Sequence, residues 1–132
     1  MILYLLIALG GALGSLSRFL LNGLISNWTG PIFPWGTVII NITGSFVIGF
    51  FDALTGPEGR VFVGQNGRQF FMTGICGGYT TFSSFSLQTL NLVNDEEWLL
   101  AGANVVLSVV SCLAAVWLGH VAAMWINLRK GV

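Results

Sequence analysis

The sequence predicts an all-α integral membrane protein with four membrane-spanning helices, on two observations. Hydrophobic residues make up 55% of the 132-residue chain and charged residues only 8%, against roughly 25% charged residues in an average soluble domain. Each span needs about 20 apolar residues, and four apolar stretches of that size follow one another. They leave room only for short connections, so residues 1–132 are predicted to form a single transmembrane domain.

Hydropathy and turn residues place the four spans in chain order. They cover approximately Ile2–Leu24, Trp35–Leu54, Phe70–Val93 and Trp98–Leu128. The chain enters the first span without a basic segment or a cleavage site, so this span is predicted to be retained. Glycines and prolines mark the first two connections, and an acidic turn marks the third. Tryptophans lie near the predicted span ends, where amphipathic aromatic residues mark a membrane interface.

The third span contains an irregular stretch, GICGGYTTFSSFS at Gly74–Ser86. Adjacent glycines followed by two β-branched threonines favour a helix break near Gly77–Thr80. Irregular backbone at membrane depth is tolerated only where protein or a water-filled cavity surrounds it. We therefore expect this stretch to handle an ion or a solute. Other glycines are predicted to let helices approach closely: Gly10, Gly11, Gly14, Gly44 and Gly49.

Polar side chains recur at helical spacing in the second and fourth spans. The stripes consist of Thr37, Asn41 and Ser45, and of Asn104, Ser108 and either Ser111 or Cys112. Residues four apart share one face of a helix, so two stripes beside a broken helix predict a narrow polar path. The alternative is that these groups only join helices to one another, at roughly 0.6–2 kcal/mol each.

Charge and missing motifs exclude several function classes. A net charge of zero provides no electrostatic footprint for nucleic acid. Every carboxylate lies at a span end or in a connection, whereas proton-coupled transporters bury an acid in mid-span. No catalytic motif is present, so an enzyme is not expected. Cys76 and Cys112 lack metal-ligand spacing and are predicted to be small buried apolar groups. These observations favour a passive channel.

Basic residues give a weak orientation signal. An orientation with the N-terminus inside places four of the five basic residues on the cytoplasmic side: Arg60, Arg68, Arg129 and Lys130. Arg18, near the end of the first span, falls toward the other side. Its guanidinium either reaches the headgroups or lines a vestibule that attracts anions.

Three strings carry a resemblance to a known family: GGALGSLSRF at Gly10–Phe19, GTVIINITGSFVIGF at Gly36–Phe50, and TGICGGYTTFSSFS at Thr73–Ser86. They resemble the fluoride channel family (Fluc, also called CrcB), and the third string is the most specific. The resemblance implies an antiparallel, dual-topology dimer of four-helix subunits with two narrow pores. It also implies a prokaryotic cell (inner) membrane, passive fluoride export and resistance to fluoride toxicity.

The resemblance also assigns roles to single residues. Phe82 and Phe85 match the pore phenylalanines, whose positive ring edges would face the anion. Asn41 matches the pore asparagine, and Arg18 a vestibule arginine. The carbonyls of Gly77 and Thr80 match a site for a structural sodium ion at the dimer centre. Further polar lining is implied at Thr37, Thr81, Ser83, Ser108 and Ser111 or Cys112.

Two departures from the family pattern, the identity of the partner and two rival function classes stay open. Many family members carry Glu at the position of Gln88 and a hydroxyl at that of Cys112. The charge bias leaves open whether the partner is a second copy or an oppositely oriented paralogue. A small multidrug-type exchanger would need a buried acid in the first span, and Met1–Asn22 contains none. A non-transporting membrane scaffold would use every polar stripe as helix contact.

Overall fold

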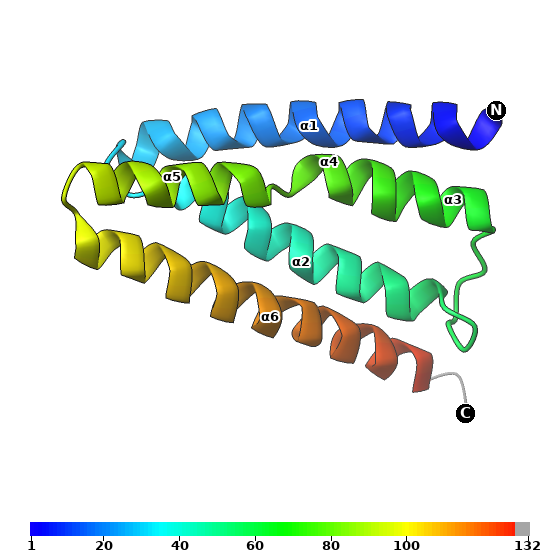
Figure 1. The fold of residues 1–132 in the computed structure, drawn as a ribbon. Coiled ribbons are helices and arrows are strands. Elements are labelled where there is room, and N and C mark those ends of the chain that lie inside the picture. The colour runs from blue at the N-terminus through cyan, green and yellow to red at the C-terminus, as the bar shows by residue number, and fades with distance from the viewer. Residues whose placement is uncertain (129–132) are drawn as a thin grey trace.

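The computed structural model describes residues 1–128, in which all regular structure is helical. The chain runs four times between the two ends of an elongated bundle (Figure 1). Its elements are α1 (Ile2–Thr29), α2 (Trp35–Thr55), α3 (Gln65–Gln69), η1 (Phe70–Cys76), α4 (Gly77–Tyr79), α5 (Phe82–Asn94) and α6 (Trp98–Leu128). The α2 helix packs along α6, whereas α1 packs along η1 and α4. The acidic turn leads from α5 into α6.

Three helices, α1, α2 and α6, are long and apolar enough to cross a membrane. The predicted bounds of the second and fourth spans agree with α2 and α6 to within a residue. The first helix continues to Thr29, five residues beyond the predicted Leu24, and Gly30 then ends it with a φ of 81°. A positive φ costs glycine little because it has no Cβ. The turn chemistry was therefore correctly recognised, but the helix extends all the way to it.

The third predicted span is two helical pieces laid end to end. Residues 65–79 are helical through α3, η1 and α4, and η1 is a wide π-type turn in which the Gly77 N–H donates to the Met72 carbonyl. The chain is then extended at Thr80 and Thr81, and α5 begins at Phe82. Figure 1 shows the two pieces in line, and the first of them packs along α1. The break predicted near Gly77–Thr80 exists and lies at the end of that range, at Thr80 and Thr81.

Glycines allow α1 to contact the first of these pieces backbone to backbone. A Cβ added at Gly78 would lie 2.5 Å from the Gly11 carbonyl oxygen, and one added at Gly14 would overlap the Ile75 carbonyl oxygen. Gly77 has helical dihedral angles, φ −64° and ψ −36°. The expectation that Gly78 would favour a break over helix packing was therefore wrong, because Gly78 packs against the α1 backbone. Gly49 similarly admits the α6 backbone at Val116.

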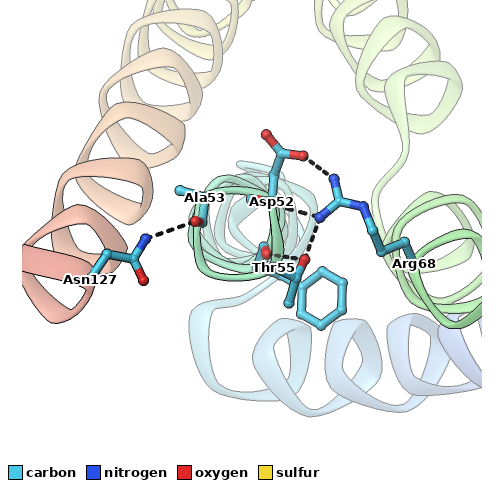
Figure 2. A network of polar contacts seen from close by, with 6 residues as sticks. Asp52, Ala53, Thr55, Arg68 and Asn127 are labelled. Carbon is cyan, nitrogen blue, oxygen red and sulfur yellow. Dashed lines mark hydrogen bonds and ion pairs between the residues drawn. The ribbon is translucent and has the colours of Figure 1, made fainter. Parts of the chain in front are cut away.

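A polar network fixes α2 between its neighbours near its last turn (Figure 2). Arg68 of α3 pairs with the Asp52 carboxylate at 2.6 Å and also donates to the Thr55 hydroxyl. From the other side, the Asn127 amide of α6 donates to the Ala53 carbonyl at 2.9 Å. The network joins three passes of the chain at the end of the bundle where the N-terminus lies (Figure 1). Arg129 and Lys130, which contribute to the predicted charge bias, lie outside the described residues.

Candidate functional site

One asparagine on α2 holds the extended backbone of the break. The Asn41 amide donates to the Thr81 carbonyl at 3.0 Å, and its Oδ1 accepts from the Thr81 N–H at 2.8 Å. Thr81 is buried, and buried backbone groups need such partners. Asn41 thereby supplies the acceptor that the Thr81 N–H would have had in a continuous helix. Its bond to the Thr81 carbonyl is an additional one, because an N-cap carbonyl also accepts the first bond of its helix. One N–H of the Asn41 amide remains to face a ligand.

The side chain of Thr81 starts the next helix. Its hydroxyl is the N-cap of α5 and accepts from the Ser84 N–H at 3.2 Å, which satisfies one of the free donors at the start of a helix. Two carbonyls lose their usual partners as a result. In a continuous helix Gly77 would accept from Thr81 and Thr80 from Ser84, and both of these N–H groups are bonded elsewhere.

A central cavity of about 390 Å³ lies beside the break. It brings together seven of the residues that sequence reasoning selected: Asn41, Gly77, Thr80, Thr81, Phe82, Phe85 and Ser108. Ser45 and Cys112 line it as well, so the two polar stripes converge on one space. For the position that sequence left open between Ser111 and Cys112, the structure places Cys112 at the cavity.

The two phenylalanines lie in the first turn of α5. Their ring centroids are 5.2 Å apart and the ring planes are inclined at 50°, so the rings share one side of the helix. Phe85 is buried at 8% exposure, whereas Phe82 is 75% exposed. The N-terminus of a helix carries partial positive charge, and here it adjoins the ring pair at the cavity. This combination suits an anion although no charged side chain of residues 1–128 lines the cavity.

A second space, the arginine cavity, measures about 360 Å³ and lies between α1, α2 and α5. Arg18, Thr37 and Gln88 line it, and Thr81 lines both cavities. Gln88 has a buried Oε1 atom without a hydrogen-bond partner in the described part of the chain. Arg18 therefore lies with neutral polar groups around it, and its positive charge is available to attract an anion.

Two predicted lining residues lie outside both cavities. Ser83 is exposed, with its hydroxyl 3.2 Å from that of Thr81, and Ser111 is half-buried on α6. Asn104 belongs to the predicted stripe but links helices: it donates to the Thr89 hydroxyl at 2.9 Å and accepts from Ser108 at 3.3 Å. For Asn104, the packing alternative describes the contacts better than a lining role does.

Several lining residues were not found from the sequence. Met72 and Cys76 line the central cavity, and Asn22 and Ser84 line the arginine cavity. Thr81 had a signal as a helix N-cap, because threonine is a preferred residue there, but this signal does not identify Ser84 as a lining residue. Met72 had none, since an apolar residue within a predicted span gives no indication of the cavity beside it.

Comparison with known proteins agrees with this architecture. Residues 5–120 match the family described as CrcB-like protein, Camphor Resistance (CrcB). A protein of Opitutus terrae named fluoride-specific ion channel FluC is 63% identical over 131 residues, covering 99% of each chain. A protein of the same name from Rhodospirillum rubrum is 64% identical over 124 residues, 94% of this chain and 96% of its own length. The chain therefore belongs to the CrcB-like protein family.

Proposed function

We propose that this chain is a membrane channel that conducts fluoride passively and is not an enzyme. Relatives more than 60% identical over nearly the whole chain bear the name fluoride-specific ion channel. The single structural observation that carries the proposal is the central cavity, where Phe82, Phe85 and the free N–H of Asn41 meet at the α5 N-terminus. Ring edges, amide N–H groups and helix N-termini all favour an anion.

Four membrane crossings are part of the proposal. Besides α1, α2 and α6, the broken segment of residues 65–94 would make the fourth crossing. Its two helical pieces together measure about 40 Å at 1.5 Å per residue, against roughly 30 Å of hydrocarbon. Of the two extended residues, Thr81 lies buried in the bundle with both of its backbone groups bonded to Asn41, as membrane depth requires.

The transport direction follows from acid trapping and needs no coupled ion. Hydrogen fluoride crosses a membrane as a neutral acid and ionises in the more alkaline cytoplasm. An inside-negative potential then drives the anion outward at about 2.3 kcal/mol per 100 mV. The carboxylates lie in the last turn of α2, in its following connection and in the acidic turn. This placement supports a passive channel in the cell membrane over a proton-coupled exchanger.

We further propose that two antiparallel copies form the working channel, with fluoride, lipid and the second copy as partners. Phe82 lines the central cavity but is 75% exposed, so the cavity is open at this ring and a second chain would close it. An oppositely oriented paralogue is the alternative partner. Native mass spectrometry of the channel expressed alone should give a dimer mass; a monomer that conducts would contradict this part of the proposal.

A structural sodium ion fits the residues at the break. The Gly77 and Thr80 carbonyls would hold it, because hydrogen bonds to Asn41 and Thr81 have taken their usual donors. Carbonyl oxygens are ligands of hard cations, and the end of a helix carries partial negative charge. When bound, the ion would supply positive charge that offsets repulsion between nearby anions. These residues of the chain orient the oxygens and exclude water.

The decisive experiment is fluoride efflux from proteoliposomes under a potassium-driven potential, followed with a fluoride electrode and repeated with chloride. We expect rapid release of fluoride and none of chloride. Phe82→Ile and Phe85→Ile should each lower the rate about tenfold or more with the dimer intact. Phe50→Ile, which alters a stacked phenylalanine pair elsewhere on α2, is the matched control. Absence of fluoride release from well-folded dimers would refute the channel and favour the scaffold.

A further inference from the structure

We infer that the central cavity binds a soft monovalent metal ion, Ag⁺ or Cu⁺, through sulfur. The chain has two cysteines and three methionines, and both cysteines and one of the methionines line this one space: Met72, Cys76 and Cys112. They come from two elements distant in sequence, η1 and α6. Their convergence is therefore a property of the fold, not of one helix face.

The arrangement offers sulfur donors from two sides. Met72 and Cys76 lie four residues apart on η1 and so share its face toward the cavity. Cys112 faces the same space from α6 and is half-buried, whereas Cys76 is 3% exposed. Both cysteines are free thiols. The cavity volume, about 390 Å³, leaves room for an unhydrated ion between the two elements.

Sulfur chemistry selects the class of ion. Thiolate and thioether groups prefer soft ions such as Cu⁺, whereas oxygen ligands suit hard cations. Binding forms a metal–sulfur bond at a cysteine and releases the thiol proton to solvent. One positive charge enters as another leaves, so the apolar cavity gains no net charge, which is the condition under which burial is tolerable.

An occupied sulfur site would obstruct the path beside Phe82 and Phe85, which line the same cavity. This consequence, block of fluoride release by silver, rests on the proposed function. The binding itself does not. The two can therefore be measured separately, first on the purified protein and then in proteoliposomes.

Binding is tested on the full chain in detergent with silver nitrate, in buffer free of chloride and of thiol reductants. Silver retained after desalting is measured by elemental mass spectrometry, and maleimide labelling of Cys112 is followed by peptide mass spectrometry. We expect about one silver ion per chain and at least tenfold slower labelling of Cys112 when silver is bound. No retained silver would overturn the inference.

Variants separate a shared site from one reactive thiol. Met72→Leu, Cys76→Ser and Cys112→Ser should each weaken silver binding about tenfold or more. Met124→Leu, a methionine of α6 at 38% exposure outside the cavity lining, should bind as the parent chain does. If Met72→Leu and Cys76→Ser both retained parental affinity, Cys112 would be reacting alone and the site would be refuted. Met72→Leu serves as the test should Cys76→Ser not fold.

Fluoride release in the presence of silver completes the test. We expect micromolar silver to block efflux in the parent chain, whereas Cys112→Ser should need at least tenfold more silver to fall below its own silver-free rate. Silver fluoride is soluble, so silver does not remove the anion from solution. Undiminished efflux at saturating silver would overturn the block. Absence of efflux before silver is added would instead contradict the proposed function, while the retained silver would still report on the site.

Discussion

Asn41→Leu is the substitution whose effect can best be worked out from the structure. Leucine has the same side-chain branching and number of heavy atoms as asparagine but offers neither a donor nor an acceptor. It would leave the Thr81 N–H and carbonyl without the bonds of 2.8 and 3.0 Å that Asn41 now supplies. Thr81 is only 8% exposed, so water is a poor replacement. The Thr81 N–H would lie unpaired at membrane depth, whereas the carbonyl would keep the first bond of α5.

The size of the effect follows from two limits. An unsatisfied buried backbone N–H costs about 1–3 kcal/mol in a water-soluble protein. Hydrogen bonds within membrane proteins average about 0.6 kcal/mol and reach about 1.7 kcal/mol, because the unfolded chain also finds partners in the membrane. We therefore expect Asn41→Leu to lower the free energy of unfolding by about 1–3 kcal/mol.

A second consequence concerns the break itself. Without Asn41, the Thr81 N–H becomes free to donate to the Gly77 carbonyl, which is its partner in a continuous helix. The extended segment should then tend to become helical and withdraw the carbonyl from the cavity. We expect the stability loss to be accompanied by a fall in fluoride efflux greater than the fraction of unfolded protein explains.

The assays follow these two steps. Thermal unfolding in detergent gives the stability change, and hydrogen exchange of peptides containing the Thr81 amide gives the local change. Ser45→Ala is the matched control, because Ser45 lies one turn further along α2 and lines the same cavity. It should leave exchange at Thr81 unchanged. Parental stability together with parental exchange at Thr81 in Asn41→Leu would show that the amide does not hold the break.

Two further predictions concern packing and the polar network. Gly14→Ala should destabilise the fold by about 1–3 kcal/mol, because the added Cβ would overlap the η1 backbone. A Cβ added at Gly11 meets nothing within 4 Å, so Gly11→Ala should be neutral or stabilising. Equal melting temperatures for the two variants would contradict this contrast. Asp52→Asn should cost less than about 1 kcal/mol, since the carboxylate is 53% exposed. Arg68→Met, which breaks bonds to two residues, should speed proteolysis of connection 56–64, and unchanged cleavage would count against the network.

The spans were predictable because hydropathy is a local signal. Lipid-facing helices must be apolar along their length, so α2 and α6 appear in the sequence nearly at their observed bounds. The break was only partly predictable. Its position depends on Asn41, forty residues away from Thr81, and on the packing of Gly78 against Gly11. Local propensities do not include either contact, and the predicted range Gly77–Thr80 therefore reaches only the first of the two extended residues, Thr80.

The roles of the residues in the polar stripes were also only partly predictable from the sequence. Periodicity placed Asn41 and Ser108 on inward faces, and both line the central cavity. It could not distinguish Asn104, whose amide is engaged by Thr89 and Ser108, because a packing amide and a lining amide have the same spacing. The role of Met72 could not be predicted from periodicity, because an apolar side chain lines a cavity only when the elements packed opposite it leave space there.

The break also explains how a site for ions can be built without a charged side chain in its lining. Asn41 and the Thr81 hydroxyl bond to N–H groups that a continuous helix would have used. This ends one helical piece with free carbonyls and begins the next with free N–H groups, within two residues of each other. The ends carry partial charges of opposite sign, about half an elementary charge each. Burying charged side chains would cost desolvation free energy, whereas these partial charges belong to backbone dipoles that the helices hold in place. We therefore expect fluoride occupancy in the central cavity to depend more on Asn41 than on any charged side chain of residues 1–128.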